Sequence, residues 1–397
     1  MPLISFPPTN FLRYFLKREA NQFFTSVAIR SLALGMVVIF EPIYLYNFFG
    51  HSLSLTLLFF GAIQGLYGLL AVWGAKFMAR VGLKHSILFS HVFFWAYYMS
   101  LFLIGKFFLF VPLAIVLKAV GMTLFWPAFH TDFIRFSEND YQGRAVGKMN
   151  VVFSIPTILS PAIGGAILGL AGYQALFISV LIVLFASSIP MFLSRETHVV
   201  YSDSYKKAWS RLFKKENWRA TLAFASSSME AGVREILWPI FMFVLAISFT
   251  VMGGITTLAL GVGSLFVLYM GRISDSISNR VWFLNIGSVL TSMAWIIKYF
   301  VLTPFDAFLA KTLYGICRST ADIPFQTFFY KKASLKRGEA DEFIVYRTIV
   351  LNLSYFFFFS LLALLFLFTA KINIAFLIAA VVSLGIIFLG VPPKLKW

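Results

Sequence analysis

Long apolar stretches separated by short polar connections are the feature that most constrains this chain. Each stretch holds about 20 or more mostly apolar residues, the length that an α-helix needs to cross the hydrocarbon core of a bilayer. With 60% hydrophobic residues, 12% charged residues and a mean hydropathy of +0.85, the 397-residue chain has too much apolar surface for a water-soluble core. The pattern predicts an all-α membrane protein with twelve transmembrane helices. We expect these helices at about 21–50, 53–76, 86–105, 107–129, 145–172, 175–193, 218–247, 250–271, 281–302, 305–329, 343–369 and 372–391.

The two halves of the chain repeat each other at a constant separation of 197 positions (239 − 42). Because Gly and Pro determine backbone geometry, their recurrence favours a duplicated helical unit over chance matches in a glycine-rich sequence. We expect an N-terminal segment 1–20, a six-helix bundle 21–194, a basic linker 195–217, and a pseudo-repeated six-helix bundle with a short tail, 218–397. The matched pairs are Gly35 and Gly232, Pro42 and Pro239, Ile43 and Ile240, Gly74 and Gly271, and Pro127 and Pro324.

The basic residues indicate topology. A net charge of +17 would suggest a nucleic-acid partner in a soluble protein, but here Lys and Arg gather in alternate connections, as the positive-inside rule describes. We expect a multi-pass protein of the cell (inner, cytoplasmic) membrane with both termini cytoplasmic, surrounded by lipid and binding no nucleic acid. In the linker, Trp209, Leu212 and Phe213 recur at helical spacing, which fits either an interfacial helix or a plain tether.

Ionisable residues well inside the apolar stretches fall on the expected first, fourth, seventh and tenth helices. A charge that faces lipid at the bilayer centre costs between about 2.5 and more than 10 kcal/mol, so these residues should face protein or a wet cavity. We expect these four helices to line one polar interior with a substrate or ion site, and ion pairs that only hold helices together are the alternative. The residues are Arg30, Glu41, Lys118, Glu230, Arg234, Glu235, Arg318 and Asp322.

Helical spacing predicts which of these charges can pair. Glu230 and Arg234 are four residues apart and can pair within the seventh helix, as can Arg318 and Asp322 within the tenth.

Two further charges have no partner of that kind. Glu41 and Lys118 lack an oppositely charged residue three or four positions away, so each needs a partner on another helix, a water, a ligand or a proton. A carboxylate that exchanges a proton can couple solute movement to a proton gradient, which makes Glu41 the candidate for coupling. Lys298 and Lys311 lie near helix ends and are expected to snorkel towards the headgroups.

Four prolines lie inside the expected helices, where each removes a backbone N–H and favours a bend. The bends are expected at Pro42, Pro127, Pro239 and Pro324, either as moving hinges or as static packing kinks.

Residues for enzymatic or metal chemistry are sparse. Cys317 is the single cysteine, and the five histidines show no metalloprotease spacing, so we expect no cofactor and no metal site. His130 and Asp132, with Asp140 nearby, form the best candidate cluster for an enzyme, and a solvated helix end is the more common setting for such residues.

Two segments resemble known motifs. The segment 271–280 keeps Gly271, Asp275 and Arg280 of a G-x-x-x-D-R-x-G-R-R loop, and so resembles the major facilitator superfamily of secondary transporters. Its first-half counterpart keeps Gly74 and Arg80 but has no carboxylate at the matching position.

A third segment, in the fifth helix, keeps Pro161, Gly164 and Gly165 of the G-P-x-x-G-G motif that this family associates with antiporters, and it is also suited to close helix packing.

The resemblance implies that two six-helix bundles rock about a central site. The expected function is secondary transport of a small organic solute by a monomer, in the form of proton-coupled export, with proton- or sodium-coupled import of an anionic or zwitterionic metabolite as the alternative. A membrane-embedded enzyme or a receptor is the reading from a different class.

Overall fold

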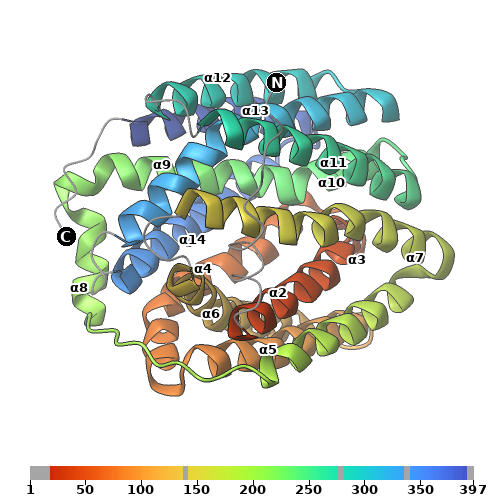
Figure 1. The fold of residues 1–397 in the computed structure, drawn as a ribbon. Helices are drawn as coiled ribbons and strands as arrows, with labels where there is room; N and C mark the ends of the chain where they lie inside the picture. Colours follow the sequence, from red (N-terminus) through yellow and green to blue (C-terminus); the bar gives the residue numbers. More distant parts are fainter. Residues whose placement is uncertain (1–17, 137–141, 275–279, 335–339, 391–397) are drawn as a thin grey trace, which may run out of the picture.

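The computed structural model describes residues 18–136, 142–274, 280–334 and 340–390, with side chains over 22–134, 155–267, 269, 281–329 and 341–389 (Figure 1). Within these ranges the regular secondary structure is entirely helical. In the first half the helices are α2 (Arg18–Val37), α3 (Glu41–Phe48), α4 (Leu53–Val81), α5 (Leu83–Leu103), α6 (Phe110–Phe136) and α7 (Gln142–Phe192). In the second half they are α9 (Trp218–Gly232), η3 (Val233–Leu237), α10 (Trp238–Val244), α11 (Phe249–Ser274), α12 (Arg280–Tyr299), α13 (Pro304–Ser334), α14 (Ala340–Leu365), α15 (Asn373–Ser383) and η4 (Leu384–Gly390).

Helix starts recur between the halves at nearly the separation that the Gly and Pro pairs show. From α3 to α10 the start moves by 197 residues (238 − 41), and from α4 to α11 by 196 (249 − 53). Equivalent positions in the two halves can therefore be compared by adding 197.

The long helix α7 reverses its direction. Gly172 has a φ of 77°, a value that glycine adopts without strain, and it separates two helical arms that Figure 1 shows folding back on each other near the α7 label. As one straight helix of 51 residues, α7 would be about 77 Å long, more than twice the hydrocarbon thickness. The expected boundary between the fifth and sixth helices, near 172–175, falls at this reversal.

Eight of the described helices are long and apolar enough to cross a membrane. The expected count of twelve is not reached by that measure, for three physical reasons. Ile155–Phe192 counts once although it contains the reversal, Asn373–Leu389 is short, and α9–α10 and α13 carry the charged residues of the interior. The helices that fall short by composition, α9–α10 and α13, carry the charged residues of the second half.

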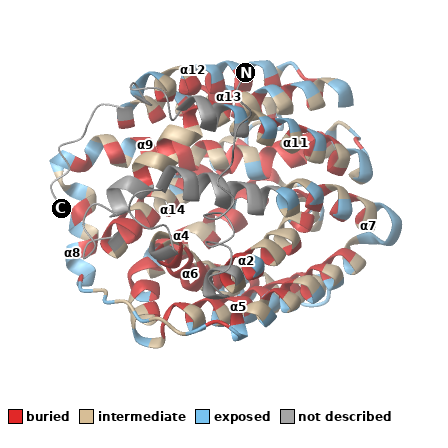
Figure 2. Cartoon of the chain, in the orientation of Figure 1, coloured by how far each residue is buried: buried red, intermediate tan, exposed pale blue. Residues whose placement is uncertain are grey.

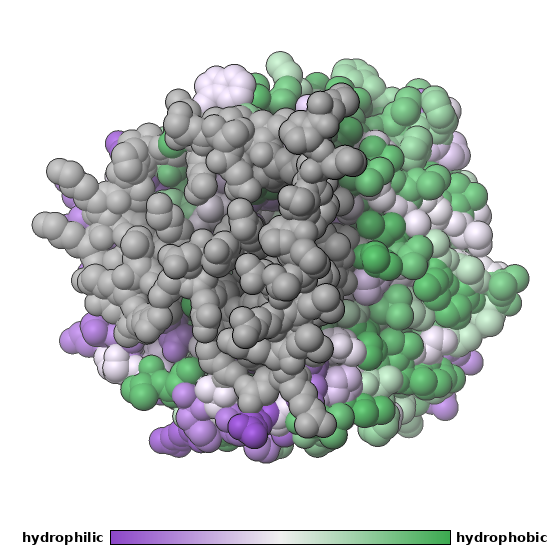
Figure 3. Space-filling model, viewed as in Figure 1, coloured by the Kyte–Doolittle hydropathy of each residue, from purple (hydrophilic) through white to green (hydrophobic). Residues whose placement is uncertain are grey.

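Much of the exposed surface of the described helices is apolar. Figure 2 shows buried and exposed positions alternating along the helices, and in Figure 3 hydrophobic side chains cover much of the right-hand face. Exposed residues include Leu170 (89%), Ile182 (64%), Phe185 (67%) and Leu361 (65%). An exposed apolar belt of this extent fits a protein whose solvent is lipid.

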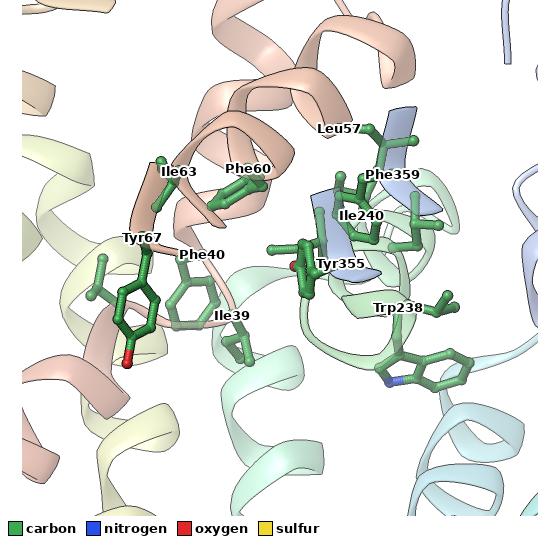
Figure 4. Close-up of a cluster of buried hydrophobic side chains, with 14 of the residues drawn as sticks. Ile39, Phe40, Leu57, Phe60, Ile63, Tyr67, Trp238, Ile240, Tyr355 and Phe359 are labelled. Carbon is green, nitrogen blue, oxygen red and sulfur yellow. The ribbon is translucent and has the colours of Figure 1, made fainter. Parts of the chain in front are cut away.

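The two halves pack along two helix pairs, α4 with α14 and α7 with α11. At the first pair, Phe60 and Tyr67 of α4 belong to the same buried apolar cluster as Tyr355 and Phe359 of α14 (Figure 4). At the second pair, Ala162 donates its backbone N–H to Thr257 Oγ1 at 3.1 Å.

The fifth-helix motif lies at this second pair of helices. A side chain at Gly165 would lie 2.6 Å from the carbonyl oxygen of Phe249 in α11, and a side chain at Gly164 would collide with the backbone of Met36 in α2. Pro161 packs its backbone against Gly253 of α11. These small residues permit close helix contact, as expected.

The linker between the halves forms α8 (Tyr205–Ser210), η1 (Arg211–Phe213) and η2 (Lys215–Asn217). Ala208 is buried in a small cluster with residues of α4 and α14, and Trp209 and Leu212 pack against that cluster, whereas Phe213 is 85% exposed. The linker therefore contacts both halves. Contact of Phe213 with lipid stays a prediction.

Candidate functional site

Glu41 and Lys118 form an ion pair between the first and fourth helices of the chain. Lys118 Nζ of α6 donates to Glu41 Oε1 at the start of α3. Two tyrosines of α5 complete the carboxylate's surroundings: Tyr97 OH donates to Oε1 at 2.8 Å and Tyr98 OH contacts Oε2 at 3.4 Å. The side chain of Glu41 is 4% exposed and that of Lys118 is 18% exposed. Of the partners that the sequence left open for Glu41 and Lys118, the structure therefore gives each residue the other one, on a different helix.

Arg30 lies in the same half, eleven residues before Glu41 (41 − 30), and has a different environment. Its guanidinium lies 3.5 Å from the centroid of the Phe125 ring and 4.7 Å from that of Phe94, and the residue is 5% exposed. Within the part of the chain that the structure describes, Arg30 makes no hydrogen bond and no ion pair, and its Nε is buried without an acceptor. A buried arginine without an anion is unusual, because burial removes water that would otherwise solvate the charge.

Glu230 is the centre of a denser cluster in the second half. Its side chain is fully buried and accepts hydrogen bonds from Trp295 Nε1 of α12, at 2.9 Å, and from Tyr314 OH of α13. Arg318 of α13 lies 3.3 Å from Glu230 Oε2 and 2.8 Å from Asp322 Oδ1. The prediction that Arg318 and Asp322 pair is confirmed.

The predicted pairing of Glu230 with Arg234 is wrong. Arg234 pairs with its neighbour Glu235 at 2.9 Å, and Glu230 takes Arg318 from another helix. The reason is the π-helical turn Val233–Leu237, which lengthens the turn after Glu230 and moves Arg234 off the face that a regular i, i+4 spacing would give.

Lys298 and Lys311 do not snorkel, which corrects a second expectation. Lys298 is 1% exposed and its Nζ lies 3.9 Å from the ring centroid of Trp295, 3.7 Å from that of Tyr314 and 4.6 Å from that of Trp238. Lys311 is partly buried and donates to Thr256 Oγ1 at 2.9 Å. Both ammonium groups are turned into the protein, where aromatic faces and a hydroxyl receive them.

Tyr355 of α14 is within reach of the electrostatic field of both halves. Tyr355 lies within electrostatic range of Glu41, Arg234 and Glu235, although these come from opposite halves of the chain. The side chains of Arg234 and Glu235 keep 39% and 47% of their area exposed, and that of Asp322 keeps 37%. Charged groups that keep open area in mid-helix can contact a solute.

The aromatic partners of the carboxylates were not identified from the sequence. Tyr97, Tyr98, Trp295 and Tyr314 are common residues in membrane helices and have no charge to draw attention to them. The repeat does relate two of them, because Tyr98 and Trp295 lie at equivalent positions (98 + 197). In the structure both residues contact a buried glutamate.

The prolines divide into two pairs. Pro42 follows a break between α2 and α3, and Pro239 lies in the first turn of α10 directly after the π-helical turn. Pro127 and Pro324 lie inside uninterrupted helices, α6 and α13. A bend or hinge at the second pair stays a prediction.

The first copy of the loop motif, from Gly74 to Arg80, has no carboxylate of its own, and Glu196 places one beside the helix that follows the loop. Gly74 packs tightly against Thr123 of α6, and Arg80 is exposed in the last turn of α4. Glu196, after α7, accepts the backbone N–H groups of Lys84 and His85 in the first turn of α5, each at 3.1 Å. A negative charge at a helix N-terminus is stabilising. In the second copy, Asp275 and the side chain of Arg280 lie outside the described residues, as does any side-chain contact around Gly271.

The candidate enzyme cluster is packed among aromatic rings. The His130 ring contacts Trp126 and Phe329, at 5.6 and 5.5 Å between centroids, and Asp132 is buried. Asp140 lies outside the described residues. Among the described residues no group of three or more His, Cys, Asp or Glu side chains is placed to hold a metal ion.

The fold and the buried charges define a multi-pass α-helical membrane protein with a polar interior. The sequence model of the Major Facilitator Superfamily matches residues 23–340, which is most of the chain. This chain therefore belongs to the major facilitator superfamily, and its membership points to a transporter of a solute across the membrane.

Comparison with known proteins adds the fold. No curated protein matches the sequence. Among solved structures, the chain is similar to the crystal structure of the human organic anion transporter MFSD10 (TETRAN), with a TM-score of 0.71 and 12% sequence identity over 94% of this chain and 99% of that one. At that identity the likeness shows a shared fold.

Proposed function

We propose that this chain is a secondary active transporter that carries a small organic solute by alternating access. In this proposal twelve spans form two six-helix bundles, both termini are cytoplasmic, and a monomer is the working unit because both bundles lie in one chain. The observation that carries the proposal is that each half holds an ion pair inside the bundle, Glu41 with Lys118 and Glu230 with Arg318, while Tyr355 lies within electrostatic range of charges from both halves. A solute bound there would contact both bundles at once.

Contacts between the halves at both ends of the bundle support alternating access. Where α6 ends and α14 begins, Thr131 Oγ1 donates to Asp341 Oδ1 at 2.6 Å. At the opposite end, Ser54 Oγ donates to the carbonyl oxygen of Ala363 at 2.8 Å, and the rings of Tyr46 and Phe243 lie 6.5 Å apart. Transport would require each of these sets to separate in turn while the other holds.

The Glu41–Lys118 pair supports proton coupling. A proton bound at Glu41 removes the negative charge that Lys118 contacts. The ammonium group of Lys118 then becomes available to an anionic solute and repels a cationic solute. The fifth-helix motif favours exchange, and we therefore propose export of the solute against protons. Import of an anionic or zwitterionic metabolite with protons or sodium is the second candidate. The similar human protein is an organic anion transporter, which supports a charged organic solute.

Purified protein in proteoliposomes with a pH-sensitive dye in the lumen tests this function. We expect an imposed solute gradient to move protons, in the direction opposite to the solute for antiport and in the same direction for symport. Glu41→Gln should abolish the proton movement, and Arg219→Gln, at the start of α9 beside Trp218, is the matched control. Solute flux that leaves lumen pH unchanged would reject proton coupling. Turnover of a lipid or sugar donor without any gradient would favour an enzyme.

A further inference from the structure

Among the residues whose side chains are described, each half has one buried arginine between its first and fourth helices. Arg30 extends from the first helix of its half, and Arg318 extends from the fourth helix of its own half. In the first half Arg30 extends from α2, and the residue equivalent to Arg318 is Gly121 of α6 (318 − 197). In the second half Arg318 extends from α13 and donates to Ser227 Oγ at 2.9 Å, and Ser227 is the residue equivalent to Arg30 (30 + 197). Arg318 thus contacts the small residue that stands in place of Arg30, whereas the space beside Gly121 is occupied by Phe94, one of the two rings on which Arg30 stacks.

The two arginines differ in what neutralises them. Arg318 contacts Glu230 and Asp322, at 3.3 and 2.8 Å. The positions equivalent to these carboxylates are Ala33 (230 − 197) and Phe125 (322 − 197). At position 125, where the second half supplies a counter-ion, the first half supplies the ring on which Arg30 stacks.

We propose that Arg30 is the binding site for the anionic group of the transported solute, which makes the substrate an organic anion with a carboxylate or sulfonate group. This inference rests on the proposed transport function and names its substrate class. Arg30 is 5% exposed and has no hydrogen-bond or ion-pair partner among the described residues. A guanidinium can bind two oxygen atoms of a carboxylate or a sulfonate with two parallel hydrogen bonds, and stacking on Phe125 fixes its orientation.

The surroundings also select the rest of the solute. The rings of Phe94 and Phe125 give the site apolar walls, which suit an aromatic or aliphatic body attached to the anionic group. The ion pair of Glu41 with Lys118 lies in the same half, and Tyr98 is within electrostatic range of both Arg30 and Glu41. A bound anion at Arg30 would therefore change the electrostatic surroundings of the proposed proton-carrying residue.

Equilibrium binding of three planar probes of similar shape tests the site: benzoate is anionic, benzamide is neutral and benzamidine is cationic. The measurement is the concentration-dependent rise in unfolding temperature of the purified protein in detergent. We expect benzoate to stabilise the wild-type protein more than either other probe, and Arg30→Gln to weaken benzoate binding by about tenfold or more. Arg219→Gln should bind benzoate like the wild type. If no carboxylate probe stabilises the protein, or if benzamide does so equally, the assignment is wrong.

Position 125 gives a second test that keeps Arg30 in place. Phe125→Asp installs the carboxylate that the second half has at Asp322, so it should neutralise Arg30 and abolish benzoate binding. Phe125→Leu removes the ring without adding a charge and should bind benzoate more weakly than the wild type but measurably. Equal binding by Phe125→Asp and Phe125→Leu would contradict the proposal.

A purely structural role for Arg30 makes a different prediction, because removing a structural arginine lowers the unfolding temperature. We expect Arg30→Gln without ligand to unfold at or above the wild-type temperature, since it removes a buried charge that lacks a counter-ion. The binding tests use no gradient, so they separate this inference from the transport function. Benzoate binding without transport would reject the function alone, and transport of neutral solutes unaffected by Arg30→Gln would reject the anion site alone.

Discussion

Glu41 and Glu230 are both buried carboxylates on the first helix of their half, yet they are held in different ways. Glu230 is fully buried and fixed by an indole, a phenol and Arg318, whose side chain is only 7% exposed. Glu41 has Lys118 as its cation, and that side chain is 18% exposed. Glu230 already has a buried cation and two hydrogen-bond donors, whereas the cation beside Glu41 is partly open and leaves that pair able to exchange a proton. The comparison teaches that two similarly buried carboxylates can differ in how accessible their partner cation is.

The two carboxylates also lie at different depths. The position equivalent to Glu41 is Trp238 (41 + 197), eight residues beyond Glu230 (238 − 230), which corresponds to about 12 Å along a helix. Trp238 instead forms one wall of the cage around Lys298. The duplicated helices thus carry one enclosed ion pair and one open ion pair at separate levels.

The largest effect is expected where the enclosed pair is broken. Arg318→Met leaves Glu230 charged and buried without its cation, which should lower the free energy of unfolding by about 3–5 kcal/mol. Thermal unfolding of the purified protein in detergent measures it. The double variant Arg318→Met with Glu230→Gln should recover most of the loss, because Trp295 and Tyr314 can still donate to the amide oxygen. An unfolding temperature equal to that of the wild type in Arg318→Met would remove the structural role from this pair.

A smaller effect is expected at the open pair. A double-mutant cycle with Glu41→Gln and Lys118→Met should give a coupling energy of about 0.5–3 kcal/mol, below that of the Glu230 and Arg318 pair, because water can reach the partly exposed ammonium group. The same unfolding assay provides all four values. Equal coupling in the two cycles would erase the distinction between the enclosed and the open pair.

The smallest effect is expected at Lys298. Lys298→Met should change the free energy of unfolding by less than about 1 kcal/mol, since the aromatic cage still packs on an apolar chain and no carboxylate within ion-pair distance loses its cation. Trp295→Phe is the informative neighbour, because it removes the Nε1 donor to Glu230 and should cost about 1–3 kcal/mol. A larger loss in Lys298→Met than in Trp295→Phe would show that Lys298 supports the cluster.

Much of the fold could be predicted from the sequence because membrane crossings need long apolar segments and because Gly and Pro mark the repeat. The turn at Gly172 and the pairing of Arg318 with Asp322 follow from local sequence alone. The partner of Glu230 does not, because it depends on how the π-helical turn Val233–Leu237 rotates one helix against another. Glu196 could not be assigned to the first turn of α5 either, because 112 residues separate it from Lys84 and only the packing of the helices brings the two together.

The direction of the Lys298 side chain could not be predicted from its position in the sequence. A lysine near a helix end commonly extends its ammonium group to water, and the spacing alone favours that outcome. Which direction the side chain takes depends on whether an aromatic cage is present inside, and the cage here is assembled from three helices: α10, α12 and α13.

The most direct test of the account measures lumen pH in proteoliposomes during solute-driven flux, with wild type, Glu41→Gln and the matched variant Glu230→Gln compared side by side at equal amounts of folded protein. We expect solute flux to move protons in the wild type and in whatever folded fraction of Glu230→Gln remains, and proton movement to vanish in Glu41→Gln while the protein still binds solute. Proton movement that persists in Glu41→Gln and disappears only in folded Glu230→Gln would contradict the account, because the enclosed carboxylate would then be the one that carries the proton.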